Sequence, residues 1–274
     1  MKVLGGVIIH AKVLMNYNRK GGVGKTTMTA MQGYLMSQQG YKMLLVDFDP
    51  QKNLTTILNE TYDDHRDPIN TMSNVLTRGK SLKSTILSYT NNLDIIKGEG
   101  IQLDKDGLDE WSDKIGNLKA ETRINILNNL LEPLKDEYDY ILIDVPPSFN
   151  NIVKNAVMAS DGINLMLQTQ GMSFESSKDS IIDLMKLERN FKTHFQLLGT
   201  LLYLQDDSSV DVDITKKAQE FYNEVVYKYP VKVQRRAKWF MSYGIDENSY
   251  WAQRSIRMYK KAVQQIIERA EDKL

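Results

Sequence analysis

The sequence predicts an α/β fold, in which a mostly parallel, twisted sheet carries helices on both of its faces. Short apolar segments of strand length alternate with longer segments of helical pattern along most of the chain. Helical connections join parallel strands and cover both faces of their sheet, so this alternation is typical of that fold. A glycine-rich loop between the first strand and the first helix, at residues 20–27, agrees with this prediction.

The elements follow in order along the chain. Helices are expected at 26–39, where Gly40 ends the helix, at 124–134 despite Pro133, at 152–160 and at 176–189. Residues 1–274 are expected to form one domain. A polar insertion near 61–92 should hold loops and a short helix, and the part near 205–274 should be helical and basic. Strands are expected at 12–17, 43–46, 93–96, 140–143, 163–167 and 197–204.

Residues 1–10 hold a short apolar piece, Val7-Ile8-Ile9. It is too short and too weakly cationic for a secretory signal peptide, so we expect an extra edge strand or a loose tail.

Composition excludes several classes of protein. The 274 residues contain no cysteine, which excludes disulfides, thiolate chemistry and cysteine-ligated iron–sulfur clusters. Lysine and arginine together equal aspartate and glutamate, so the net charge is zero and any contact with nucleic acid must come from a local patch. Hydrophobic residues make up 42% of the chain, enough for a large core, but no apolar run approaches the ~20 residues of a membrane span.

The loop at 20–27 carries the strongest functional signal. Glycine lets the backbone approach a phosphate and turn its N–H groups toward the anion, while the helix that follows directs its positive end to the same place. Lys25 should reach the β- and γ-phosphates, and the Thr26 hydroxyl should hold Mg²⁺. A glycine-rich turn without a nucleotide is the simpler alternative. The loop reads Lys20-Gly21-Gly22-Val23-Gly24-Lys25-Thr26-Thr27.

This loop resembles the deviant Walker A motif of the ParA/MinD family of P-loop ATPases. The resemblance covers residues 13–171 well and the remainder more loosely, and it implies that the protein binds ATP and Mg²⁺. A strict P-loop has glycine where this chain has Arg19. Lys20 is the additional feature: a lysine at the start of the loop cannot easily contact phosphate in its own subunit. It therefore suggests a homodimer in which Lys20 reaches the phosphates of the partner.

Two carboxylates follow the strand at 43–46, in the segment Asp47-Phe48-Asp49-Pro50-Gln51-Lys52-Asn53. Ligands of open α/β sheets bind at the carboxyl ends of the strands. The segment is similar to the DxDPQ motif of the family, which implies that Asp49 orients the attacking water and Asp47 supports the Mg²⁺ shell. By the same resemblance Asn53 lies near the phosphates. The simpler alternatives are a solvated strand end for Asp47 and a turn cap for Asp49.

A third motif, Tyr140-Ile141-Leu142-Ile143-Asp144-Val145-Pro146-Pro147-Ser148, resembles a Walker B strand. Asp144 should bind Mg²⁺ through a water, because Mg²⁺ in proteins keeps several waters. The family usually has threonine or cysteine where this chain has Val145, so a hydroxyl contact is lost. The loop with Pro147 should sense the γ-phosphate.

The C-terminal part is rich in cations and aromatic residues. We expect Lys232, Arg235, Arg236, Lys238, Arg254 and Arg257 to bind non-specific double-stranded DNA, with Arg235 and Arg236 as first choices. A solvated helix face with core aromatics is the alternative. The full cluster comprises Lys228, Lys232, Arg235, Arg236, Lys238, Arg254, Arg257, Lys260 and Lys261, interleaved with Tyr229, Trp239, Tyr243, Tyr250 and Trp251.

The last helix does not resemble the membrane-binding helix of MinD-type members. Ile256, Tyr259, Val263, Ile266 and Ile267 recur at helical spacing, which is more typical of core packing, and acidic residues follow them. We therefore expect no membrane contact.

The resemblance implies a DNA-partition ATPase for plasmid or chromosome segregation, located in the cytoplasm on the nucleoid. A ParB-like centromere-binding protein would stimulate slow hydrolysis. No helix-turn-helix domain precedes the loop, so operator binding is not expected. The alternative is a MinD-like positioning ATPase that acts on membrane or protein cargo without DNA. A nucleotide-dependent assembly or regulatory factor is a third possibility.

Overall fold

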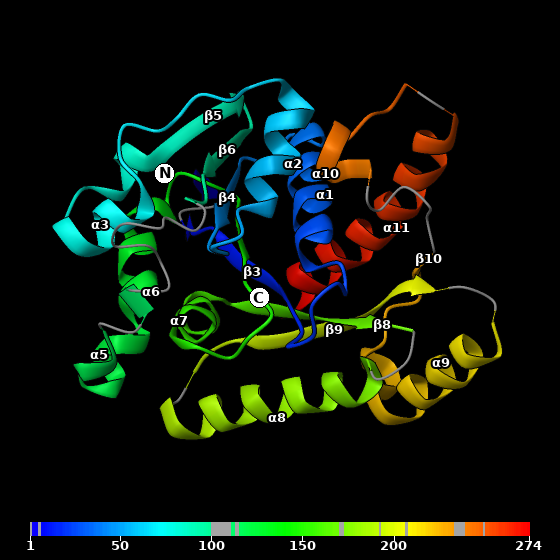
Figure 1. The fold of residues 1–274 in the computed structure, drawn as a ribbon. Helices are drawn as coiled ribbons and strands as arrows, with labels where there is room; N and C mark the ends of the chain where they lie inside the picture. The colour runs from blue at the N-terminus through cyan, green and yellow to red at the C-terminus, as the bar shows by residue number, and fades with distance from the viewer. Residues whose placement is uncertain are drawn as a thin grey trace.

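The computed structural model describes residues 2–4, 7–99, 111–112, 115–169, 173–191, 193–205, 208–232, 239–248 and 250–274. Within these residues, one large sheet runs through the molecule in the order β10-β9-β8-β3-β7-β4-β6-β5 (Figure 1). All neighbouring strands are parallel except β5, which pairs antiparallel with β6 at one edge. The predicted fold class is confirmed. The strands are β3 (Lys12–Tyr17), β4 (Met43–Asp47), β5 (Ile86–Thr90), β6 (Leu93–Ile96), β7 (Tyr140–Asp144), β8 (Gly162–Gln168), β9 (Gln196–Gln205) and β10 (Val231–Lys232).

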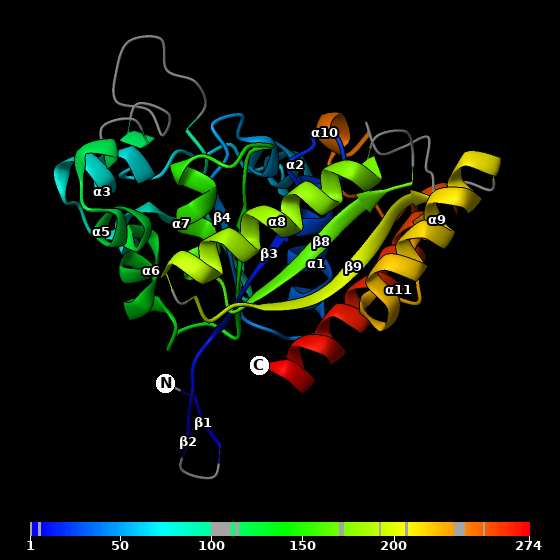
Figure 2. The same cartoon turned by 90° about the horizontal axis from the view of Figure 1, so that it is seen from below.

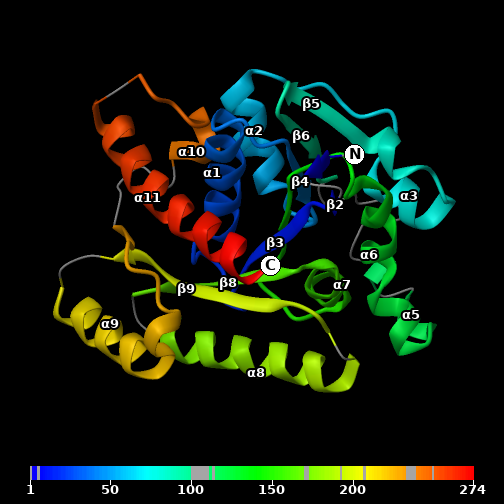
Figure 3. The ribbon, with the colours of Figure 1, turned by 180° about the vertical axis from the view of Figure 1, so that it is seen from behind.

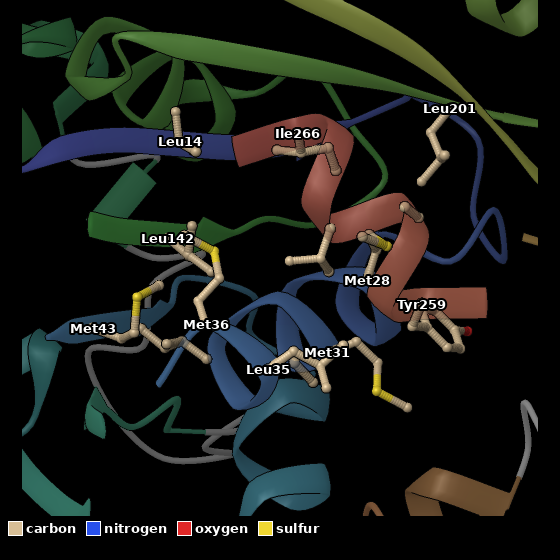
Figure 4. Close-up of a cluster of buried hydrophobic side chains, with 14 of the residues drawn as sticks. Leu14, Met28, Met31, Leu35, Met36, Met43, Leu142, Leu201, Tyr259 and Ile266 are labelled. Carbon is tan, nitrogen blue, oxygen red and sulfur yellow. The ribbon is translucent and has the colours of Figure 1, made fainter. Parts of the chain in front are cut away.

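One face of the sheet is covered by α1 (Lys25–Gln38), α2 (Asn53–Tyr62), α10 (Trp239–Tyr243) and α11 (Tyr250–Lys273). Figure 3 shows α11 from behind, where it crosses next to α1. In Figure 4, Met31 of α1 lies in the cluster that also holds Leu14 and Leu142 of the sheet and Tyr259 and Ile266 of α11. Each large apolar side chain buried in this way contributes about 1.5–3 kcal/mol relative to exposure.

The buried stripe of α11 confirms that its apolar residues pack in the core. All five of the residues expected there are at most 4% exposed. Because this face is used against α1 and the sheet, it is not available to a lipid surface. Among the helices of the described residues, none combines the length and apolar character that crossing a bilayer requires.

The opposite face is covered by α3 (Met72–Arg78), α6 (Ile126–Leu131), α7 (Asn151–Ala159) and α8 (Ser173–Phe191), and α5 (Ala120–Ile124) packs against α7. Figure 2 shows α8 running across this face. Successive strand residues alternate between the two cores, as the pleat requires: Leu45 faces α1, whereas Leu44 and Val46 face this second layer. Farther along, α9 (Ser209–Tyr222) packs Ala218 and Tyr222 on the β8–β9 end of the sheet.

The helix expected at 124–134 is broken. The chain forms α5, then α6, and then a 3-10 turn at Glu132–Leu134 that contains Pro133. At the break, Asn125 has φ −101° and ψ 4°, outside the helical region. The Asn155 side chain of α7 replaces the lost helical bonds, because its Oδ1 accepts from Leu127 N (3.1 Å) and its Nδ2 donates to Arg123 O (2.9 Å).

The segment 61–92 contains more regular structure than the expected loops and short helix. The end of α2, α3 and a 3-10 turn at Leu82–Thr85 are followed by β5, which is part of the main sheet. The alternating polar pattern of Ile86–Thr90 fits an edge strand whose side chains are half-exposed. The one-domain prediction for residues 1–274 stays a prediction.

The N-terminal segment is neither an added strand of the main sheet nor an irregular tail. Here β1 (Lys2–Leu4) and β2 (Val7–Ile9) pair antiparallel with each other in a separate two-stranded sheet.

Candidate nucleotide site

The glycine-rich loop leaves the carboxyl end of β3 and enters α1 at Lys25. Two of its glycines adopt left-handed conformations, with φ 74° at Gly22 and φ 90° at Gly24. A Cβ on Gly24 would lie 2.1 Å from the Tyr203 ring, so this position requires glycine for space as well as for backbone conformation. The first N–H groups of α1 have no partner in their own helix and are available to an anion.

Asn18 fixes the start of the loop and was not among the predicted residues. It is fully buried; its Nδ2 donates to Met166 O (2.7 Å), while its Oδ1 accepts from Lys20 N (2.8 Å) and Ser176 Oγ (2.9 Å). These bonds join the loop to β8 and α8. A polar residue directly after the first strand is the signal that could have identified it.

Arg19, which stands where a strict P-loop has glycine, points away from the loop toward α8. Its Nε lies 3.3 Å from Asp183 Oδ2, and its backbone N–H donates to Ser180 Oγ (3.0 Å). The arginine therefore adds a further link between the loop and α8.

The two lysines of the loop have different surroundings. Lys25 is buried, and its Nζ donates to Lys20 O across the loop (3.2 Å). Burial lowers the pKa of Lys25, whereas the nearby charges of Asp144 and Asp49 act in the opposite direction. Lys20 instead extends to the start of α8, where its Nζ donates to Ser173 Oγ at 2.7 Å. Its expected reach into a second subunit is not tested by this single chain.

Asp47 and Asp144 end the neighbouring strands β4 and β7 and lie directly opposite each other in register. Both are fully buried. Asp47 has protein partners, since its Oδ2 accepts from Thr55 N (2.8 Å) and Thr55 Oγ1 (2.6 Å) in the first turn of α2. Burial raises the pKa of Asp47 to about 6. The Thr55 bonds make it a support for α2, and its part in a Mg²⁺ shell stays a prediction.

Asp144 differs from Asp47 because, among the described residues, neither of its carboxylate oxygens has a hydrogen bond of ordinary geometry. Burial raises its pKa well above the usual range, with the charge of Asp47 as the second cause, while Thr26 and Lys25 lower it. An unsatisfied buried carboxylate is costly unless a cation or its bound water completes it. Together with the Thr26 hydroxyl, this oxygen donor set fits Mg²⁺.

Asp49 and Asn53 lie on the turn that joins β4 to α2. Asp49 is 4% exposed, and its Oδ1 accepts from Gln51 N at 2.9 Å, as expected for a carboxylate that also caps a turn. Lys52 adopts a left-handed conformation (φ 47°) just before α2, and Asn53 is the first residue of that helix.

A cavity of about 590 Å³ brings these predicted residues together. The unpredicted residues of its lining are Gln51, Val145, Tyr203, Leu204 and Met241. Tyr203 and Leu204 lie near the end of β9, where ligands of such sheets are expected. Asp47 and Asp144 lie behind the lining, and Val23 is buried in the core. The lining consists of Gly21, Gly22, Gly24, Lys25, Thr26, Thr27, Asp49, Gln51, Asn53, Val145, Pro147, Tyr203, Leu204 and Met241.

The arrangement can bind a polyphosphate and stabilise negative charge that develops on it. Backbone N–H groups and one lysine lie on one side, and a carboxylate that can orient water lies on the other. The cavity volume is large enough for a nucleotide, because small-molecule sites commonly span ~300–1,000 Å³.

Those expected DNA-binding residues that the structure describes do not line this cavity. Lys232, Arg254 and Arg257 are exposed on β10 and α11, whereas Arg235, Arg236 and Lys238 lie outside the described residues.

Comparisons with known proteins identify the family of the chain and several relatives. The family model described as AAA domain matches residues 11–197. The chain is 29% identical over 219 residues to the sporulation initiation inhibitor protein Soj of Bacillus subtilis (strain 168), covering 79% of this chain and 82% of that protein. It is 26% identical over 267 residues to the chromosome partitioning protein ParA of Caulobacter vibrioides, covering 96% of each.

Among solved structures, a variant of Cyanothece McdA in complex with ATP superimposes with a TM-score of 0.80 at 21% identity. The match covers 94% of this chain and 97% of that one. This likeness shows the fold.

Proposed function

The chain belongs to the AAA domain family and is a ParA-type P-loop ATPase, and from this we propose that it acts in DNA partition, in plasmid or chromosome segregation. The observation that carries the proposal is the cavity in which the glycine-rich loop, Asp49 and Asn53 converge, with the unsatisfied Asp144 behind it. The names of the related partition proteins support the biological role.

In the proposed reaction, this chain's residues position ATP and Mg²⁺ for hydrolysis to ADP and phosphate. The loop N–H groups and Lys25 would hold the phosphates, and Thr26 and Asp144 would hold Mg²⁺, Asp144 through a water. The bound Mg²⁺ supplies charge neutralisation at the phosphates. Asp49 would orient the attacking water, and Asn53 and Pro147 would respond to the γ-phosphate. Hydrolysis is slow until a partner completes the site.

We further propose that ATP joins two subunits face to face, with Lys20 of each reaching the phosphates of the other. In the isolated chain, Lys20 Nζ is held by Ser173 Oγ. Dimerisation therefore requires Lys20 to exchange this bond for a contact across the interface.

The closed dimer would bind non-specific duplex DNA through the C-terminal basic surface, and a ParB-like protein would stimulate hydrolysis and release. This places the protein in the cytoplasm, on the nucleoid. The exposure of Arg254 and Arg257 supports the DNA contact, since lysine and arginine neutralise phosphates at a surface.

Phosphate release measured at saturating ATP tests the enzymatic part. Lys25→Ala should abolish ATP binding and turnover together, whereas Asp49→Ala should retain binding and lose turnover. A Glu60→Ala variant, changed at an acidic residue of α2 outside the cavity lining, serves as the control. Full turnover by Asp49→Ala would contradict the assigned role.

The alternative is a positioning ATPase that acts on a membrane or protein cargo without DNA. Charge reversal separates the two, because Arg235→Glu/Arg236→Glu and Arg254→Glu/Arg257→Glu should abolish DNA binding only if DNA is the partner. Burial of the apolar stripe of α11 disfavours a membrane role for that helix.

A further inference from the structure

Two lysine ammonium groups that come from different parts of the fold lie near the ring of Tyr229. Lys228 Nζ and Lys261 Nζ are each 5.5 Å from the centre of its ring. A cation at this distance is attracted to the face of an aromatic ring. The ring is 41% exposed, so it can hold both charges at the surface.

The backbone at Tyr229 is fixed to α11 by two hydrogen bonds with the side chain of Gln265. Tyr229 N donates to Gln265 Oε1 and Gln265 Nε2 donates back to Tyr229 O, both at 2.8 Å, and Gln265 itself is buried. These two hydrogen bonds keep the Tyr229 ring next to Lys261, which lies on α11 together with Gln265. A surface that is ordered before binding loses less entropy when it binds.

A second anchor lies two residues earlier. The buried Tyr227 hydroxyl donates to Asn164 Oδ1 at 2.6 Å, and Asn164 Nδ2 donates to Asn16 Oδ1 at 3.2 Å. Asn16 Nδ2 in turn donates to Gln32 Oε1 of α1, the helix that begins at the nucleotide cavity. The loop that carries Tyr229 is thus connected to α1 by buried polar side chains along the α1 side of the sheet.

The cations next to Tyr229 continue along the solvent face of α11. Arg254, Arg257 and Lys261 are exposed and recur at intervals of three and four residues, opposite the buried stripe, over about 10 Å of helix. Among the described residues, no carboxylate forms an ion pair with these three or with Lys228.

The lysines of α9 show the opposite arrangement. Lys216 and Lys217 pair with Glu220 and Asp213 at 3.9 and 2.7 Å. The α9 lysines are therefore partly neutralised within their own helix, whereas the α11 row remains available to an external anion.

We infer that Lys228, Tyr229 and Lys261 form one phosphate-contact point of the duplex-DNA surface, with Tyr229 positioning the two ammonium groups. The inference rests on the proposed function, and extends it to residues outside the predicted set. A linear row of cations whose helix buries its apolar stripe in the core suits a phosphate backbone better than a lipid surface, which also takes up apolar groups.

The test measures binding of ATP-loaded protein to a fluorescent duplex of unrelated sequence at several salt concentrations. Lys228→Ala and Lys261→Ala should each weaken binding several-fold and reduce the salt slope by about 0.9, the value for one lost phosphate contact. Tyr229→Leu should weaken binding about two- to fivefold, whereas Tyr229→Phe, which keeps the ring, should bind like the unchanged protein. Lys216→Ala is the matched control.

Light scattering of the same samples reports ATP-dependent dimerisation, which all of these variants should retain. No binding of the unchanged protein to duplex DNA with ATP would refute the proposed function itself. Binding by the unchanged protein with identical affinity and salt slope in all variants would refute this inference alone. Binding to phosphatidylglycerol vesicles in place of duplex DNA would overturn both.

Discussion

Asp144→Asn should stabilise the nucleotide-free protein while removing its response to Mg²⁺. The carboxylate is fully buried, and among the described residues its oxygens have no hydrogen bond of ordinary geometry. An unsatisfied buried polar group costs about 1–3 kcal/mol, and more when it is charged. Lys25 offsets part of this cost. An amide of the same shape removes the charge, so we expect the free energy of unfolding to rise by about 1–3 kcal/mol.

Thermal unfolding in EDTA and then with Mg²⁺ and a non-hydrolysable ATP analogue measures both effects. A gain of 1–3 kcal/mol corresponds to a Tm increase of about 2–5 °C for a chain of 274 residues. The unchanged protein should gain about 2.7 kcal/mol from ligand at one hundred times its Kd, and the variant should gain much less. Burial raises the pKa of Asp144, so stability falls as pH rises through that pKa, and the variant should lose this dependence.

Asp94→Asn provides a control of opposite sign. Asp94 is also buried in the sheet, but its Oδ2 accepts from Tyr138 Oη (2.8 Å) and lies 3.5 Å from Lys42 Nζ. Its substitution should therefore lower Tm. An Asp144→Asn protein that melts below the unchanged protein in EDTA would refute the interpretation of Asp144 as an unsatisfied cation ligand.

Three further predictions concern the loop and its surroundings. Gly24→Ala should lose about 2–5 kcal/mol of stability, from a left-handed backbone and a clash with an aromatic ring; Gly22→Ala, with open space around it, should lose only about 1–2 kcal/mol in the same denaturant titration. Ser173→Ala should strengthen ATP-dependent dimerisation about 25-fold, because each of the two subunits loses a competing bond of about 1 kcal/mol to its Lys20; weaker dimerisation by light scattering would contradict this. Burial raises the pKa of Asp47 to about 6, above its unfolded value near 4, so the stability that this group contributes is fully present below pH 4 and is lost as pH rises through about 6. Asp47→Asn should flatten that slope in unfolding titrations between pH 4 and 7.

The parallel sheet could be predicted because its strands are buried on both faces and are continuous in apolar character. Two features were missed because the local sequence lacks a signal for them. Strand β5 is a half-exposed edge strand with a polar pattern, and the helix expected at 124–134 looked continuous because its break depends on Asn155, which is distant in sequence. Contacts of that kind arise only in the folded chain.

The site likewise contains residues that local motifs predict and residues that only the fold brings into place. Glycines, Lys25, Thr26 and Asp49 are local signals, and the cavity brings them together. Tyr203 and Met241 come from the far end of the chain and reach the cavity through the positions of β9 and α10, which no local pattern specifies. The cation–π arrangement at Tyr229 likewise depends on Lys261, thirty-two positions away in the sequence, so the sequence could suggest a cationic region but not its geometry.

Binding to non-specific duplex DNA in four nucleotide conditions tests the central claim most directly: no nucleotide, ADP, ATP, and ATP with Asp49→Ala. We expect binding that requires ATP, weakens with salt and persists in the Asp49→Ala protein, because the ATP-bound dimer is proposed to be the DNA-binding state. Absence of DNA binding in every condition, with ATP-dependent dimerisation intact, would contradict the account and indicate a membrane or protein cargo.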